Sequence, residues 1–189
     1  MRVLGVDPGL ARTGVAVVDG RPGALRLVHA ECVETDATDD GARRLAELFG
    51  ALETAVRVHA PEAAAVEELF FATNRRSALL VSEARGVVLC VLARAGLDTT
   101  AYTPLQVKEA VAGYGAAPKA QVARMTRALL GVEEIPGPDD VADACAIAIC
   151  HHHRARSPEI GGPHRPARRG RMSPGLVAAV AAAQAAERP

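Results

Sequence analysis

Four carboxylate residues occupy positions from which they could jointly bind divalent cations. Asp7 and Glu67 each end a short apolar run, and Asp140 and Asp143 lie three positions apart at the start of a segment with helical spacing. Residues at this spacing share one face of a helix, about 5–6 Å apart. Clustered carboxylates repel one another unless a cation neutralises them, and ligand sets made only of oxygen select hard ions such as Mg²⁺ or Mn²⁺. Two such ions about 3.5–4 Å apart would suit phosphodiester hydrolysis.

Each of these residues also has a simpler explanation. Asp7 starts an Asp-Pro-Gly sequence, which is common in turns, and Glu67 is followed by a second glutamate that could share a solvated surface with it. Aspartates in the first turn of a helix interact favourably with the helix dipole. The hypothesis of a shared site therefore depends on a fold that brings the four positions together.

The pattern of apolar residues, glycines and prolines predicts five strands and five helices. Three strands come first, followed by a helix, a strand, a helix, a strand and three helices. The strands are expected at 3–6, 14–18, 24–34, 63–67 and 99–102, and the helices at 40–59, 77–95, 104–112, 118–131 and 139–153. Asp19-Gly20 predicts a hairpin turn between the second and third strands. This order predicts an α/β fold, a mixed five-stranded sheet flanked by helices on both faces.

The expected topology brings two of the carboxylates to one sheet edge. A right-handed crossover through helix 40–59 favours the first and fourth strands as parallel neighbours, so Asp7 and Glu67 would emerge together at the carboxyl ends of adjacent strands. Asp140 and Asp143 begin a helix that this topology can bring to the same place.

Composition divides the chain into a domain and a tail. The 189 residues carry no net charge, but residues 1–150 have 15 basic against 20 acidic side chains, and residues 151–189 have seven against two. Overall charge is therefore no argument for nucleic-acid binding. We predict one folded domain over 1–156 and a basic tail over 157–189, first rich in Pro, Gly and Arg and then in Ala, which is expected to be mobile.

Other features exclude some classes of protein. No apolar stretch reaches the roughly 20 residues that a membrane span requires, and the N-terminus lacks the pattern of a signal peptide. The four cysteines stand singly in apolar segments, which predicts reduced core residues and a cytoplasmic protein. The run His151–His153 is expected to form a polar helix end, because adjacent helical residues point in different directions and cannot share one metal ion.

Taken in order, several segments resemble the RuvC family of Holliday-junction resolvases, the crossover junction endodeoxyribonucleases. Gly5-Val6-Asp7-Pro8-Gly9, followed by Thr13-Gly14, is similar to the first motif of that family, and residues 65–70 are similar to its second. The remaining similar segments are 77–79, 83–87, 106–108, 119–122 and 140–144. The resemblance covers about residues 2–153, and the motifs are specific in combination.

The resemblance implies a metal-dependent DNA endonuclease with an RNase H-like fold. Asp7, Glu67, Asp140 and Asp143 are then the catalytic metal ligands, for two Mg²⁺ ions that Mn²⁺ could replace. It also implies a homodimer that nicks four-way DNA junctions symmetrically in recombination and repair, together with a branch-migration helicase complex.

DNA contacts are expected from residues on either side of this site. Lys108 and Lys119, the two lysines of the chain, match positions that imply phosphate contacts. Phe70 matches the aromatic position of the family and is expected to stack on an unpaired base, although Phe71 stays open as an alternative. The full set of expected DNA-binding residues is Phe70, Phe71, Arg75, Arg76, Lys108 and Lys119.

Three alternatives are compatible with parts of the sequence. The actin-like kinases and ATPases share the strand, Asp-x-Gly and hairpin order, but they require a second such domain. A related RNase H-like family processes ribosomal RNA precursors, usually with shorter chains. A catalytically silent junction-binding protein would not need all four carboxylates.

Overall fold

The computed structural model describes residues 1–68 and 75–155, which form a five-stranded mixed sheet with helices on both faces. The strands are β1 (Arg2–Asp7), β2 (Arg12–Arg21), β3 (Ala24–Glu34), β4 (Ala63–Glu67) and β5 (Asp98–Tyr102). The helices are α1 (Gly41–His59), α2 (Arg75–Arg94), α3 (Pro104–Ala112), α4 (Lys119–Leu130) and α5 (Asp139–Arg154). The predicted fold class and order of elements are confirmed. The predicted tail, 157–189, lies outside the described residues.

β1 lies at the centre of the sheet, whose strand order is β3-β2-β1-β4-β5. It pairs with β2 in antiparallel and with β4 in parallel orientation, and Val6 stands opposite Val66 in the parallel pair. The next residue of each strand is a carboxylate, Asp7 in β1 and Glu67 in β4. The parallel arrangement predicted for these two strands is therefore present.

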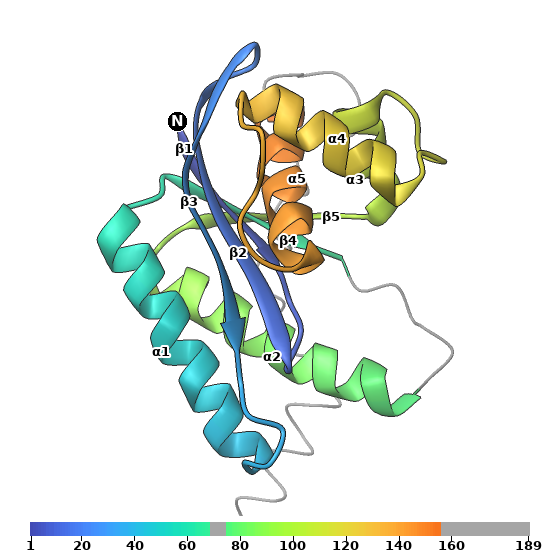
Figure 1. The fold of residues 1–189 in the computed structure, drawn as a ribbon. Helices are drawn as coiled ribbons and strands as arrows, with labels where there is room; N and C mark the ends of the chain where they lie inside the picture. The colour runs from blue at the N-terminus through green and yellow to red at the C-terminus, as the bar shows by residue number, and fades with distance from the viewer. Residues whose placement is uncertain (69–74, 156–189) are drawn as a thin grey trace, which may run out of the picture. The chain divides into compact units, whose positions relative to one another are not determined.

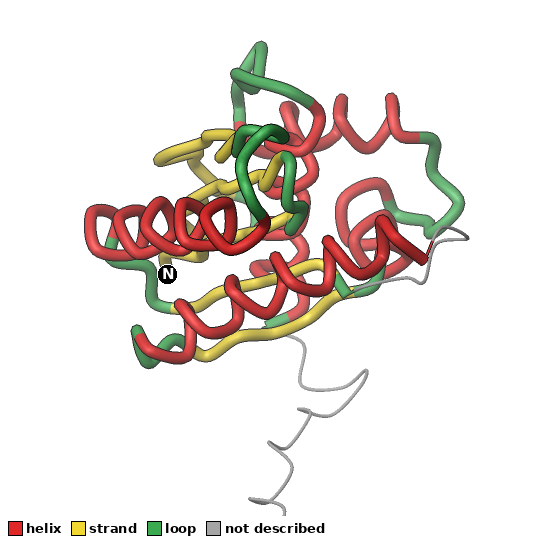
Figure 2. The backbone as a smooth tube through the Cα atoms, turned by 90° about the horizontal axis from the view of Figure 1, so that it is seen from below, coloured by secondary structure: helices red, strands yellow, loops and turns green. Residues whose placement is uncertain are grey.

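The helices cover the two faces of the sheet in separate groups. α1 and α2 pack on one face, and α3, α4 and α5 pack on the other (Figure 1). Figure 2 shows the same elements from below, with the helices in red and the strands in yellow. Alternate residues of the strands supply the two cores, as the period of two of a β-strand requires. Val3, Ala16 and Val18 face α5, whereas Leu4, Val15 and Val17 face α1 and α2.

Local sequence signals begin α1 and α3 close to the expected positions. Asp40 caps α1 by accepting the backbone N–H of Arg43 at 3.0 Å. Thr103 forms a capping box with Gln106 at the start of α3, with Pro104 in the first turn. No helix within the described ranges is both long and apolar enough to cross a membrane.

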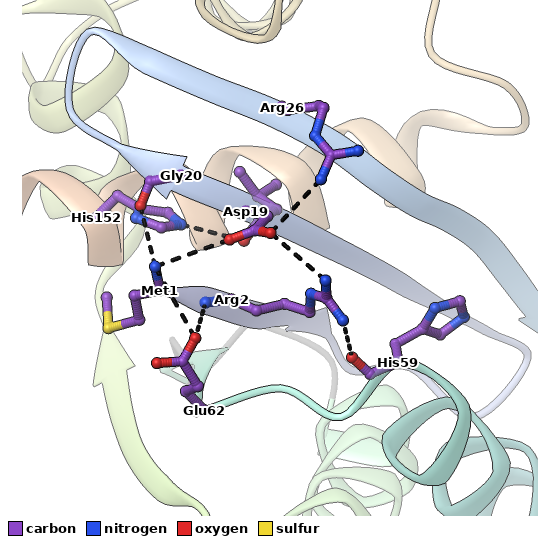
Figure 3. Close-up of polar contacts among 9 residues, drawn as sticks. Met1, Arg2, Asp19, Gly20, Arg26, His59, Glu62 and His152 are labelled. Carbon is purple, nitrogen blue, oxygen red and sulfur yellow. Dashed lines mark hydrogen bonds and ion pairs between the residues drawn. The ribbon is translucent and has the colours of Figure 1, made fainter.

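The hairpin between β2 and β3 differs from the prediction. Asp19 and Gly20 belong to β2, which continues to Arg21, and the turn lies at residues 22–23, where Gly23 has a φ of 83°. Asp19 is held in the strand by ion pairs with the Met1 amino group at 3.7 Å and with the Arg2 guanidinium at 3.5 Å (Figure 3). These charges favour continuation of the strand at a sequence that otherwise favours a turn.

The histidine run at the end of α5 also differs from the prediction. His151 and His152 are buried, so the run is not a polar helix end. Each ring contacts a different element: the contacts join His151 Nδ1 to the Tyr102 hydroxyl (3.1 Å), His152 Nε2 to the Val18 carbonyl oxygen (3.2 Å) and His153 Nδ1 to the Ala110 carbonyl oxygen (2.9 Å). Three consecutive side chains thus fix the C-terminal end of α5 to β5, β2 and α3.

Two strand glycines allow the N-terminal half of α5 to approach the sheet closely. A Cβ at Gly5 of β1 would overlap the Ala144 carbonyl oxygen, and a Cβ at Gly14 of β2 would overlap the Asp140 carbonyl oxygen. Both obstacles are helix backbone, which cannot rotate away as a flexible side chain can. The distance between α5 and the sheet therefore depends on these two glycines.

We expect Gly14→Ala to lower the free energy of unfolding by about 1–3 kcal/mol, because overpacking against backbone must displace α5. Gly50→Ala is a suitable control, since a Cβ at Gly50 of α1 has nothing within 4 Å. That control should raise stability by about 0.5–1 kcal/mol. Urea unfolding of the two variants measures both effects. A stable Gly14→Ala protein would show that α5 does not need this close approach.

Candidate functional site

Asp7 is followed by a tight turn that leads into β2. Thr13 is buried, and its hydroxyl donates to the Gly9 carbonyl oxygen at 2.6 Å, while the Gly9 N–H donates to the same hydroxyl at 3.4 Å. A Cβ at Gly9 would overlap the Arg12 carbonyl oxygen, so the turn requires glycine. These contacts fix the chain on the C-terminal side of Asp7.

Glu67 ends β4 and is held by two neighbouring elements. The N–H of the next residue, Glu68, donates to the Tyr102 carbonyl oxygen at 2.8 Å, which extends the pairing with β5 beyond the end of the strand. Arg85 of α2 donates from Nε to the Glu67 carbonyl oxygen at 3.3 Å. The backbone that carries the Glu67 carboxylate is therefore connected to both the sheet and α2.

Asp140 and Asp143 lie at the N-terminal end of α5, above the same edge of the sheet. α5 passes over Gly14, which stands opposite Asp7 in the antiparallel pairing of β1 and β2. The charges of both aspartates act on Asp7. The structure therefore brings the four predicted carboxylates together from β1, β4 and α5.

The electrostatics of this cluster are unfavourable for its ionised form. Burial is the largest cause that raises the pKa of Asp7 to about 7, and the charges of Glu67, Asp143 and Asp140 contribute to the same shift. Burial and then Asp143 raise the pKa of Glu67. A buried group of like charges needs a positive partner in order to ionise fully.

Two basic residues approach the aspartates of α5. Arg12 Nε lies 3.2 Å from Asp140 Oδ2, and Lys119 Nζ lies 3.0 Å from Asp143 Oδ2 and 3.4 Å from Asp139 Oδ2. Burial opposes the charge of Lys119, but the hydrogen bonds and charges of Asp143 and Asp139 outweigh it and raise the pKa of Lys119. The negative cluster is thus partly neutralised by side chains of the protein itself.

The carboxylate oxygens of the four residues are of the kind that a hard divalent cation prefers, although the side chains are not arranged around a common ion position. Within residues 1–68 and 75–155, no group of three or more His, Cys, Asp or Glu side chains already has the arrangement of a metal site. Asp140 Oδ2 is nevertheless buried and accepts no hydrogen bond from a described residue. An all-carboxylate set with an unsatisfied oxygen suits Mg²⁺ or Mn²⁺, provided that the side chains close around the ion.

A pocket of about 190 Å³ adjoins the carboxylates between α3, α4 and α5. Glu67, Asp143, Lys108 and Lys119 supply its charged groups. Its apolar wall is formed by Pro104, Val107, Val122, Ala146 and Ile147. Both lysines predicted to contact phosphates thus line a cavity beside the carboxylate cluster.

The other predicted DNA-binding residues lie at or beyond the limit of the described structure. Phe70 and Phe71 fall within 69–74, outside the described residues. Arg75 and Arg76 begin α2, but their side chains are outside the described part. Their roles stay predictions.

Sequence reasoning missed Arg12 and Arg85 as neighbours of the site. Arg85 lies in a motif that the family resemblance included, so a signal for it was present in the sequence. Arg12 is the first residue of β2, five positions after Asp7, and no spacing rule connects it with Asp140, which is more than 120 positions away. Only the tertiary structure brings these two residues together.

Comparisons with known proteins agree on one family. Residues 3–151 match the family described as "Crossover junction endodeoxyribonuclease RuvC". The protein of that name from Moorella thermoacetica is 49% identical over 166 residues, which cover 86% of this chain and 99% of the relative. The one from Pelotomaculum thermopropionicum is 48% identical over 153 residues, covering 81% and 93%.

Solved structures give the same result. RuvC of T. thermophilus in complex with a Holliday junction substrate aligns with a TM-score of 0.79 at 40% identity, covering 82% of this chain and 95% of that one. The yeast mitochondrial Holliday junction resolvase Ydc2 aligns with a TM-score of 0.60 at 13% identity, covering 80% and 78%. At that identity the second likeness concerns the fold alone.

The raised pKa of Asp7 predicts how the metal-free protein responds to pH. A carboxyl whose pKa rises from 3.8 when unfolded to about 7 when folded binds its proton more tightly in the folded state. The free energy of unfolding therefore falls as pH rises from about 4 to about 7. Asp7→Asn removes this loss. In EDTA, the variant should match the wild type at pH 4 and exceed it by about 1–4 kcal/mol at pH 8.

Thermal or denaturant unfolding across this range tests the prediction. Saturating Mg²⁺ should remove or reverse the advantage of Asp7→Asn at pH 8, because a bound cation stabilises only the wild-type cluster. An advantage that is independent of pH would contradict the electrostatic explanation.

Proposed function

The chain belongs to the RuvC family of crossover junction endodeoxyribonucleases, and from this we propose that it resolves four-way DNA junctions by metal-dependent hydrolysis of two symmetric phosphodiesters. The observation that carries the proposal is the convergence of Asp7, Glu67, Asp140 and Asp143 from three elements on one sheet edge, with the pKa of Asp7 raised to about 7. The first named relatives share almost half of their residues with this chain.

In this proposal the four carboxylates are the metal ligands, for two Mg²⁺ ions that Mn²⁺ can replace. Such ions lower the pKa of a bound water and stabilise the charge on the attacking and leaving oxygens. The protein supplies the orientation of these ligands. Strand pairing fixes Asp7 and Glu67. The close packing of α5 against Gly5 and Gly14 fixes Asp140 and Asp143. Rigid positioning matters because small displacements of a ligand set reduce the rate strongly.

Lys108 and Lys119 are proposed to bind the phosphates beside the scissile bond. Both line the pocket that contains Glu67 and Asp143, so a phosphate at the carboxylates would lie within their reach. The apolar wall of the pocket would exclude water from one side of the bound strand and strengthen these charge interactions. Phe70 stays our choice for stacking on an unpaired base at the junction centre.

The alternatives receive less support. The match over residues 3–151 is to the RuvC family, which favours junction cleavage over the processing of RNA. The presence of all four carboxylates argues against a catalytically silent junction-binding protein. The T. thermophilus relative has been solved with a Holliday junction substrate, and we propose the same class of substrate for this chain.

Paired nicks require two active sites, and α2 is the proposed contact between two copies of the chain. Leu79 is 60% exposed and Leu80 is 37% exposed, both in the N-terminal half of α2. Burial of these side chains against a symmetry-related copy would remove apolar surface from water.

A branch-migration helicase complex is proposed as a further partner from the family resemblance. Cys145 and Cys150 are buried as predicted, but Cys32 is only partly buried and Cys90 is exposed, so these two are not core residues. A cytoplasmic location is proposed because all four cysteines are unpaired.

Asp7→Asn and Glu67→Gln should each lower the rate of junction nicking in Mg²⁺ by at least about 100-fold, because removal of a ligand disrupts the cation site. Junction binding should persist in both variants. Asp39→Asn is a matched control, since Asp39 pairs with Arg43 at the start of α1 and is not one of the four proposed ligands. Gel assays of cleavage and binding on a synthetic four-way junction measure both properties. Nicking at the wild-type rate by either site variant would refute the proposed ligand set.

Light scattering at micromolar concentration should report a dimer, and Leu79→Glu should convert it to a monomer by placing a charge in the apolar contact. Val58→Glu provides the control, because Val58 of α1 is 61% exposed but is not on α2. A dimer that survives Leu79→Glu would show that the contact lies elsewhere.

A further inference from the structure

The two pairs of carboxylates in the site differ in their charge partners. Asp140 and Asp143, on α5, each lie within 3.2 Å of a basic nitrogen, from Arg12 and from Lys119 respectively. Asp7 and Glu67, on the strands, form no ion pair with a described residue. Among the described residues, the basic nitrogens at ion-pair distance from the four carboxylates therefore contact the two helix aspartates, and they come from two different elements, β2 and α4.

The contact of Arg12 with Asp140 is an ion pair without a hydrogen bond. Asp140 Oδ2 is buried and accepts no hydrogen bond from a described residue, although Arg12 Nε lies 3.2 Å away. The Arg12 side chain itself is 54% exposed. A buried carboxylate oxygen without a hydrogen bond is unfavourable. Arg12 therefore neutralises the charge of Asp140 but leaves its Oδ2 without a hydrogen bond.

Lys119 occupies an unusual position for a cation. It is the first residue of α4, where the positive end of the helix dipole disfavours positive charge. Its side chain is 60% exposed, and it contacts Asp143 and Asp139 across the start of α5. The negative field of the carboxylates therefore compensates for an unfavourable location in its own helix.

We propose that Arg12 and Lys119 are resident counter-ions of the site, which neutralise Asp140 and Asp143 in the metal-free protein and compete with divalent cations for the same carboxylate oxygens. The proposal rests on the proposed function, because it takes Asp140 and Asp143 as metal ligands. It adds a role for Arg12, which no motif assigns, and it makes the affinity for the metal depend on residues that are not ligands.

Removal of a counter-ion is expected to have opposite effects on the stability of the protein and on its affinity for a divalent cation. Removal of either counter-ion leaves the metal-free cluster with more uncompensated negative charge, which lowers its stability. The same removal strengthens binding of a divalent cation, because no internal cation must first be displaced. Once displaced, the guanidinium and ammonium groups remain beside the site, where a DNA phosphate is the anion available to them.

Isothermal titration of the full-length protein with MnCl₂, in the absence of DNA, tests the inference. Arg12→Gln and Lys119→Gln should each bind Mn²⁺ about three- to ten-fold more tightly than the wild type, while their melting temperatures in EDTA at pH 8 should be lower. Arg12→Lys keeps the charge and should stay near the wild-type affinity. Arg26→Gln is the matched control, because Arg26 is an exposed partner of Asp19 in the ion-pair cluster of Figure 3.

The outcomes separate this inference from the function on which it rests. If the wild type binds Mn²⁺, Asp7→Asn weakens that binding, and the two Gln variants bind no more tightly than the wild type, the counter-ion role is refuted while the ligand set stands. If the wild type binds no Mn²⁺, both proposals fail. A lower melting temperature without tighter binding would assign Arg12 and Lys119 a structural role only.

Discussion

The close packing of α5 on β1 and β2 is the contact on which the other features of the site depend. Gly5 and Gly14 remove the side chains that would hold this helix away from β1 and β2, and the helix backbone fills the space. At its other end, His151–His153 fix the helix to three different elements. Between these anchors α5 has little freedom, so Asp140 and Asp143 are presented to Asp7 by a rigid element. Sites built on such elements hold their geometry better than sites on loops.

The same packing places like charges close together, and the basic side chains nearby neutralise only part of this negative charge. Burial and three neighbouring carboxylates raise the pKa of Asp7 to about 7, which destabilises the ionised cluster at neutral pH. Arg12 and Lys119 reduce this repulsion from the helix side, but Asp140 Oδ2 remains without a hydrogen bond from the described residues. A site that is fully satisfied without metal would have little affinity for it. Incomplete neutralisation is therefore consistent with a cluster whose ionised form is completed by a bound cation.

Much of the fold and part of the site could be predicted from sequence, because the relevant signals are local. Strand ends, helix caps and apolar periodicity identify every element, and the parallel crossover then makes Asp7 and Glu67 neighbours. The failures have non-local causes. Asp19-Gly20 is typical of a turn, but ion pairs of Asp19 with Met1 and Arg2 keep these residues in β2. The buried state of His151 and His152 and the contact of Arg12 with Asp140 depend on elements that are far apart in the chain. Gly5 and Gly14 are intermediate cases: glycine inside a strand indicates a close approach, but not which element approaches.

The central claim, that α5 completes a cation site with the two strand ends, is tested most directly by anomalous diffraction from crystals grown with Mn²⁺. Strong anomalous density should lie within about 2.0–2.2 Å of carboxylate oxygens of Asp7 and Glu67, and α5 should contribute Asp140 or Asp143 to the same ions. Arg12 Nε and Lys119 Nζ should then lie farther from Asp140 and Asp143, respectively, than the 3.2 Å and 3.0 Å described above. Density elsewhere, or none at this edge of the sheet at saturating Mn²⁺, would contradict the account.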